Sequence, residues 1–223
     1  MLILSIPDMP MSSEDVFSPL IEHAIELAAQ WHDGTYRKGS WRDPAFEPPG
    51  DASVQVPVPV MAHLTAVATT VQRAGWSDET VAAAYLHDVI EDKNQHGQRF
   101  RRAQLRRAIG AEVAALVEGV TEQKLDTESN ERPWRARKID YIAQLNDGRV
   151  ECVAISLSDK LHNLWSMNQA LQRGVDIFTD GPNRTALSAG PKSQHWFHRA
   201  VLEASTAHED PRLRPLRERL EQE

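Results

Sequence analysis

The segment 81–92 constrains this chain more than any other part of the sequence. Its first half is apolar, and it leads directly into His87-Asp88 and Glu91-Asp92. If the segment is one helix, residues four apart share a face, so His87 lies over Glu91 and Asp88 over Asp92. Burying three carboxylates and an imidazole is costly unless a cation compensates their charge. The pattern therefore predicts a helix that contributes to a divalent metal site.

Two other predicted helices offer further ligands for such a metal. His63 opens an apolar helix that ends near Gly75, and Asp159 lies one turn before Asn163 in the segment 152–164. Each of these alone also fits a hydrogen-bonded residue of the core. Two imidazoles and two carboxylates together suit Mn²⁺, Fe²⁺ or Zn²⁺, with positions left open for water and hence for catalysis. The predicted ligands are His63, His87, Asp88 and Asp159.

At these motifs the chain resembles the HD-domain phosphohydrolases. More narrowly, it resembles the hydrolase domain of the RelA/SpoT family and its single-domain relatives, the small alarmone hydrolases, which include metazoan SpoT homologues. The resemblance covers about Val16 to Asn163, with a fainter match near Trp196-Phe197. Besides the metal motifs, it rests on the segments 28–34, 37–39, 109–113, 116–124 and 158–163. It implies an all-α fold, an HD-domain helical bundle in a single domain.

The resemblance also implies an activity, a metal-dependent hydrolysis of the 3′-diphosphate of (p)ppGpp. The products are GDP or GTP and pyrophosphate, and the implied cofactor is Mn²⁺, which activates the attacking water. The implied roles are metal binding by His63, His87, Asp88 and Asp159, proton transfer by Glu91 and Asp92, and nucleotide binding by Arg37, Lys38, Lys124 and Asn163. The chemistry of these residues agrees, because a metal-activated water needs no serine or cysteine nucleophile and phosphoryl oxygens need nearby cations.

Some of these residues have a simpler reading. Arg37-Lys38 also fits an ordinary solvated turn, and Lys124 fits a cation at the C-terminal end of a helix.

Departures from the family bear on the identity of the substrate. The proline-rich stretch 40–58, with Trp41 and Phe46, separates Arg37 from His63, where the family connects them more directly. Its prolines exclude a helix, and it is either a lid over the nucleotide or a surface excursion. Lysine, arginine and tyrosine are common in the family at three positions occupied here by Ser156, Trp165 and Trp196.

Three alternative functions therefore stay open. They are hydrolysis of (p)ppApp, an HD-type nucleotidase that releases orthophosphate, and a non-catalytic nucleotide-binding regulator. The Glu91-Asp92 pair disfavours the regulator, because a protein that only binds needs no proton-transfer groups. The cations at Arg37, Lys38 and Lys124 disfavour a monophosphatase.

Composition fits one well-buried domain, because the 223 residues are 41 % hydrophobic and 26 % charged. We expect a core at about 12–173, the inserted stretch at 40–58 and closing helices at about 191–223. The first helix is predicted from Ser12-Ser13 to Trp31, and another runs from Ser77 through the metal-binding segment. Further helices are predicted at 102–109, 111–120 and 133–145, and one begins after Gly148. A loop at 179–192 precedes the last two predicted helices, at 196–207 and 213–220.

Net charge, cysteine content and hydrophobicity indicate the partners and the cellular location to expect for this protein. Its net charge of −7 disfavours nucleic acid as a partner, and the arginines between 99 and 107 fit a solvated helix face. The single cysteine, Cys152, excludes an intramolecular disulfide and is predicted to be a buried thiol. No apolar run approaches ~20 residues and no signal peptide is recognisable, so we expect a cytoplasmic protein with a nucleotide substrate and no membrane partner. Homo-oligomer formation is left open.

Overall fold

Helix α7 (Val150–Gln172) runs through the middle of the computed structural model, which describes residues 16–42, 56–180 and 185–223. Every residue from Cys152 to Lys160 is buried. Helices α2, α5, α8 and α9 all contact α7, so its first half has protein on all sides. A helix enclosed in this way forms part of a core, and here it carries Asp159 into the interior.

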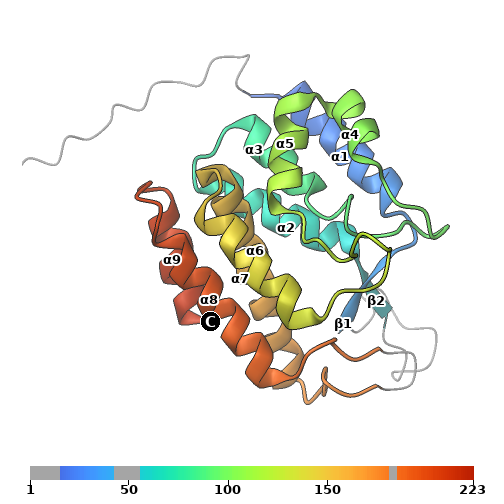
Figure 1. Cartoon of the computed structure of the whole chain (residues 1–223), viewed down its shortest axis with the longest axis vertical. Helices are drawn as coiled ribbons and strands as arrows, with labels where there is room; N and C mark the ends of the chain where they lie inside the picture. The colour runs from blue at the N-terminus through green and yellow to red at the C-terminus, as the bar shows by residue number, and fades with distance from the viewer. Residues whose placement is uncertain (1–15, 43–55, 181–184) are drawn as a thin grey trace, which may run out of the picture.

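The helices form two groups that pack against each other, and α7 of the second group contacts several helices of the first (Figure 1). The first group consists of α1 (Pro19–Trp31), α2 (Val60–Arg73), α3 (Asp78–Leu86), α4 (Arg102–Ile109) and α5 (Ala111–Val120). The second consists of α6 (Trp134–Asn146), α7, α8 (Pro191–Ser205) and α9 (Leu213–Gln222). A two-stranded antiparallel hairpin, β1 (Tyr36–Arg42) and β2 (Val56–Pro59), lies against α2 and α7. The predicted all-α helical bundle is confirmed, with this hairpin as an unpredicted addition.

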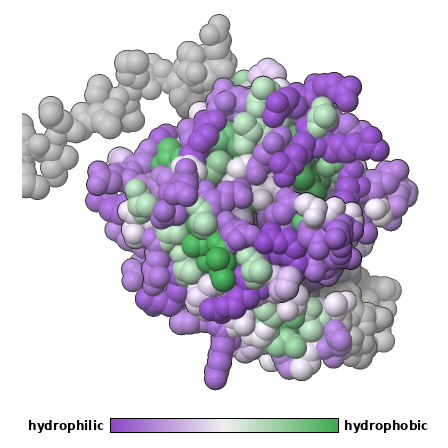
Figure 2. All heavy atoms as spheres, viewed as in Figure 1, coloured by the Kyte–Doolittle hydropathy of each residue, from purple (hydrophilic) through white to green (hydrophobic). Residues whose placement is uncertain are grey.

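The core consists of apolar side chains from both groups of helices. Leu64, Leu86, Ile155 and Leu157 are among the side chains that are fully buried within it. The face of the molecule in Figure 2 is mostly hydrophilic, with small hydrophobic areas between the polar ones. Among the helices of the described ranges, none is both long enough and apolar enough to cross a membrane.

The prediction that one helix continues through His87 to Asp92 is wrong. Helix α3 ends at Leu86, and turns follow from His87 onward. The His87 ring contributes to this, because its Nδ1 lies 2.7 Å from the Ala84 carbonyl, which in a continued helix would accept from the Asp88 amide. One helix-like bond survives beyond it, from the Asp92 amide to the Asp88 carbonyl (2.9 Å).

Other element boundaries also differ from the prediction. The first helix begins at Pro19 with Ser18 as its N-cap, while the predicted caps Ser12 and Ser13 lie outside the described residues. Helix α8 begins at Pro191, inside the predicted loop, because a proline is well accommodated in the first helical turn. Residues 40–42 and 56–58 of the inserted stretch are in the hairpin, and 43–55 are outside the described residues. The predicted domain limits, 12–173 and 191–223, stay predictions.

Cys152 is a buried thiol, as predicted. It is 3 % exposed, and burial raises its pKa to about 11. A Cβ atom added to Gly119 of α5 would come 2.6 Å from the Cys152 Sγ. The glycine therefore allows α5 and α7 to approach closely, and the cysteine serves packing rather than nucleophilic chemistry.

Helix α7 offers a direct test of its place in the core. We expect Leu157→Ala, at a fully buried position, to lower the free energy of unfolding by about 2–5 kcal/mol, because it leaves a cavity. Leu171→Ala in the same helix, at a position 45 % exposed, serves as the matched control and should change it by about 0.5 kcal/mol or less. Urea denaturation followed by circular dichroism measures both, and equal losses would contradict the buried position of α7.

Candidate metal centre

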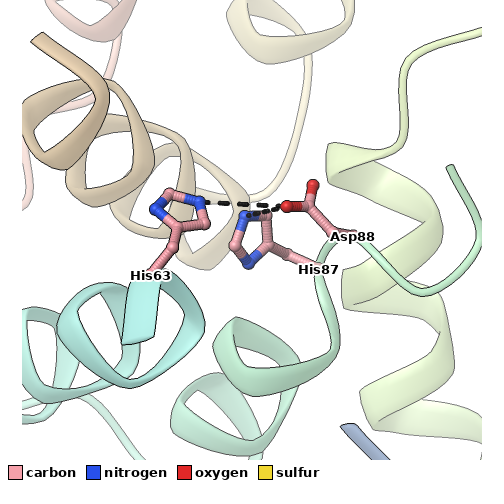
Figure 3. A group of neighbouring side chains, drawn as sticks. All are labelled: His63, His87 and Asp88. Carbon is pink, nitrogen blue, oxygen red and sulfur yellow. Dashed lines mark ion pairs between the residues drawn. The ribbon is translucent and has the colours of Figure 1, made fainter. Parts of the chain in front are cut away.

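Three segments distant in sequence bring the four predicted metal ligands together. In Figure 3, His63 of α2 and the residues His87 and Asp88 that follow α3 point toward one another. One ligand atom from each of these three lies within 4.8 Å of the other two. Asp159 of α7 adds its Oδ1, which is 3.1 Å from His63 Nε2 and 3.8 Å from His87 Nε2. These spacings are compatible with a single shared cation.

The orientation of His87 fits a metal ligand. Its Nδ1 carries a proton, because its neighbour at 2.7 Å is the Ala84 carbonyl oxygen, which can only accept. In the neutral imidazole the lone pair is then on Nε2, 3.4 Å from Asp88 Oδ2. This Nε2 is buried and makes no hydrogen bond with the described residues. Buried polar atoms normally have a partner, and a bound cation would supply one here.

Electrostatics at the cluster also favour a cation. Burial opposes the charged form of His87, yet Asp88 and Asp159 raise its pKa to about 9. Burial opposes ionisation of Asp159 as well, but Lys160 and the two imidazoles hold its pKa well below the usual value. Burial, with Arg37 nearby, holds the pKa of His63 well below its usual value, so this imidazole is neutral. The negative field that raises the pKa of His87 is the field that attracts a divalent ion.

The predicted proton-transfer pair lies beside the cluster. Glu91 Oε1 accepts from the Glu122 amide at 2.6 Å, and Glu91 Oε2 lies 3.2 Å from Lys124 Nζ. Lys124 Nζ also lies 3.1 Å from Asp92 Oδ1, so one ammonium group holds both carboxylates. Burial raises the pKa of Glu91 to about 6, against the opposing effect of Lys124. A carboxylate with a pKa near neutrality is suited to accept and release protons.

The four predicted nucleotide-binding residues all line one cavity, and Lys124 differs from the other three in its pairing with the two acidic residues. Arg37 of β1 donates from Nη2 to Asn163 Oδ1 at 2.7 Å, and the Asn163 amide donates in turn to Asp159 Oδ1. These two residues, together with Lys38, therefore lie at the edge of the metal cluster. Lys124 lies with the acidic pair instead, where it neutralises carboxylates.

Two cavities meet at this edge. The larger, of about 410 Å³, has His32, Asp88, Asp92, Lys93 and Lys124 in its lining. The smaller, of about 230 Å³, includes Trp134, Lys138, Lys160, Phe197 and His198 in its lining. Arg37, Lys38 and Asn163 line both cavities and so lie between them. Cationic side chains in both cavities suit the phosphates of a nucleotide, and the aromatic side chains of the smaller cavity suit its base.

Sequence reasoning missed several polar residues that support the site. Lys160 forms an ion pair with Asp159, and Glu122 forms ion pairs with Arg137 and Lys138. Lys160 and Glu122 lie within motifs 158–163 and 116–124, so the motifs themselves pointed to them. The Tyr141 hydroxyl donates to Ser156 Oγ at 2.9 Å, a pairing that no sequence pattern announces.

Comparisons with known proteins agree with this geometry. A family model described as HD domain matches residues 51–180. The chain is 33 % identical over 149 residues to a GTP pyrophosphokinase of Streptomyces coelicolor and 36 % identical over 109 residues to a guanosine-3′,5′-bis(diphosphate) 3′-pyrophosphohydrolase of Haemophilus influenzae. These matches cover 66 % and 48 % of this chain, but only 14 % and 15 % of the two relatives.

Two solved structures share the fold. One is lmo0812 from Listeria monocytogenes, with a TM-score of 0.58 and 28 % identity over 72 % of this chain and 89 % of that one. The other is described as a metazoan ortholog of SpoT that hydrolyzes ppGpp and plays a role in starvation responses. It has a TM-score of 0.62 at 20 % identity and covers 92 % of this chain and 96 % of that one.

The assignment of Asp88 as a metal ligand can be tested without any substrate. If Asp88 is a direct ligand, as its position predicts, Asp88→Ala should lower the affinity for Mn²⁺ by more than the roughly 10–100-fold typical of residues around a metal site. Asp78→Ala, an exposed position of α3, is the control and should keep the metal. Elemental analysis of the purified variants measures this, with circular dichroism to verify the helices. Full Mn²⁺ content in Asp88→Ala would contradict the ligand assignment.

Proposed function

The chain belongs to the HD domain family, and we propose that it is a metal-dependent phosphohydrolase that removes the 3′-diphosphate from (p)ppGpp. Its products would be GDP or GTP and pyrophosphate, the activity of a guanosine-3′,5′-bis(diphosphate) 3′-diphosphatase. The observation that carries this proposal is the His63, His87, Asp88 and Asp159 cluster, with an acidic pair directly beside it. The name of the Haemophilus relative supports the substrate.

His63, His87, Asp88 and Asp159 would hold a divalent cation, which we propose to be Mn²⁺ and which, when bound, would lower the pKa of a water molecule and so supply a nucleophile at neutral pH. Glu91 receives a proton, because its carboxylate is mostly ionised above its pKa of about 6 and is fixed by Lys124 and the Glu122 amide. Hydrolysis breaks the bond between the 3′-oxygen and the diphosphate, so the departing 3′-oxygen must gain a proton. The proton taken up by Glu91 is proposed to return to this oxygen, with Asp92, held by the same lysine, either orienting the pair or passing the proton on.

The cations around the cleft have separate tasks in this proposal. Arg37 and Lys38 lie between the two cavities and are proposed to hold the phosphate groups. Asn163 orients Arg37 and contacts Asp159, so it links the nucleotide to the metal ligands. Lys124 is proposed to act by way of Glu91 and Asp92, and to contact phosphate oxygens from the larger cavity.

The pyrophosphokinase name of the Streptomyces relative is compatible with hydrolysis. This chain spans about one-seventh of that protein, so the name describes a much longer molecule. The segment matched by the HD domain model, residues 51–180, includes the two histidines and two aspartates of the cluster, which suit the activation of water. A cytoplasmic location, where nucleotides are abundant, completes the proposal.

The proposed reaction is tested by incubating purified, Mn²⁺-loaded protein with ppGpp and separating the products. We expect GDP and pyrophosphate in equal amounts. Turnover of ppApp without turnover of ppGpp would transfer the proposal to the adenine nucleotide. Orthophosphate as the product would identify a nucleotidase instead, and tight binding without turnover would identify a regulator.

Glu91→Gln separates metal binding from proton transfer. We expect this variant to keep its metal but to lose about 10²–10⁴-fold in kcat, because the amide cannot accept the proton. In the wild type, kcat should fall as the pH drops through about 6, since protonated Glu91 cannot act as a base. Glu79→Gln, at an exposed position of α3, is the control and should match the wild type. Full activity in Glu91→Gln would remove Glu91 from the mechanism.

A further inference from the structure

The two imidazoles of the metal cluster depend on different partners. Both face the carboxylates through Nε2, so each needs its proton on Nδ1 and an acceptor for that proton. His87 has the Ala84 carbonyl as its acceptor. The neighbour of His63 Nδ1 is another imidazole nitrogen, His162 Nδ1, at 2.8 Å. A carbonyl can only accept, whereas an imidazole nitrogen can either accept or donate.

Only one arrangement of protons at this pair suits metal binding. Two nitrogens 2.8 Å apart share a single N–H group. If His162 donated it, the neutral His63 would carry its own proton on Nε2, which is the atom that faces Asp159 at 3.1 Å. If His63 donates it, Nε2 keeps a lone pair for a cation. His162 must then accept through Nδ1 and carry its proton on Nε2.

The surroundings of His63 make this partner important. His63 is only 1 % exposed, so bulk water does not replace the acceptor if His162 is lost. The two rings are close, with centroids 4.8 Å apart. His162 also lies on α7 three residues after Asp159, so this helix supplies both a proposed ligand and the partner of a second ligand.

On its other side, His162 faces away from the substrate cleft. It lines a separate cavity of about 380 Å³ together with Thr70, Trp165 and Arg219, none of which lines the two cavities at the metal cluster. The Trp165 ring covers it with a centroid distance of 5.8 Å. His162 therefore approaches the centre from behind His63 and does not contact the proposed nucleotide site.

We propose that His162 is a positioning residue for the metal. It accepts the Nδ1 proton of His63 and so holds that ring in the tautomer and orientation in which Nε2 can bind a cation. This inference rests on the metal site of the proposed function, and it is independent of which nucleotide is hydrolysed.

Metal titration of three variants tests the inference. His162→Phe keeps a flat ring but removes the acceptor, and we expect Mn²⁺ affinity to fall by roughly 10–100-fold in a folded protein. His162→Asn places an acceptor oxygen at the same point along the side chain as Nδ1, and we expect it to recover most of this loss. His195→Phe, the same change at an exposed histidine of α8, is the control and should bind like the wild type. Isothermal titration calorimetry measures the affinities, with circular dichroism to verify folding.

Ring-nitrogen NMR of the wild type provides a second readout that packing alone would not move. In ¹⁵N-histidine protein loaded with Zn²⁺, which is diamagnetic, we expect His63 to be protonated on Nδ1 and His162 on Nε2. A His162 protonated on Nδ1 would overturn the inference, even if His162→Phe failed to fold. Equal Mn²⁺ affinities for the wild type and a folded His162→Phe would also overturn it.

These outcomes are distinguishable from a failure of the proposed function. If the wild type bound Mn²⁺ but left ppGpp intact, the substrate would be wrong while the weaker binding of His162→Phe still supported the role of His162. If the wild type bound no divalent metal at all, both proposals would fall.

Discussion

Asp159 is an ionised carboxylate in the buried half of a long helix, and the surrounding structure compensates for its charge. Lys160 pairs with it from the next position, and the imidazoles of His63 and His87 approach its Oδ1. A buried carboxylate without such partners would be strongly destabilising. The need to satisfy this one charge brings α2, the end of α3 and α7 to a common point, which is where a metal can bind.

A second layer of contacts extends from this point to the surface. The Asn163 amide contacts Asp159 and its carbonyl oxygen accepts from Arg37, so β1 is connected to the cluster through two hydrogen bonds. On the other side, Lys124 and the Glu122 amide fix Glu91, and Glu122 is itself fixed by Arg137 and Lys138 of α6. Groups with opposite charges therefore alternate outward from the centre, and the residues proposed to transfer protons have little freedom to move.

The sequence predicted the helical fold, because apolar periodicity is a local signal, and it predicted the convergence of the four candidate ligands through the resemblance of their motifs to one known family. It did not predict the end of α3 at Leu86, since that depends on the His87 ring competing for the Ala84 carbonyl. Nor did it predict that Lys124 lies with Glu91 and Asp92, because an ion pair between residues about thirty positions apart leaves no pattern in the sequence. The hairpin was missed because β2 is short and two of its four residues are proline, which is unusual inside a strand.

The hairpin explains how this chain tolerates a long stretch between Arg37 and His63. Tyr36 pairs with Pro59, and the Val60 amide donates to the Thr35 carbonyl at 3.1 Å, just where β2 passes into α2. The segments that precede and follow the inserted stretch are thus hydrogen-bonded to each other at the base of the hairpin, and His63 follows within the first turn of α2. Residues can be added beyond these contacts without changing the separation of Arg37 from the candidate metal centre, so this connection can vary in length while the site keeps its geometry.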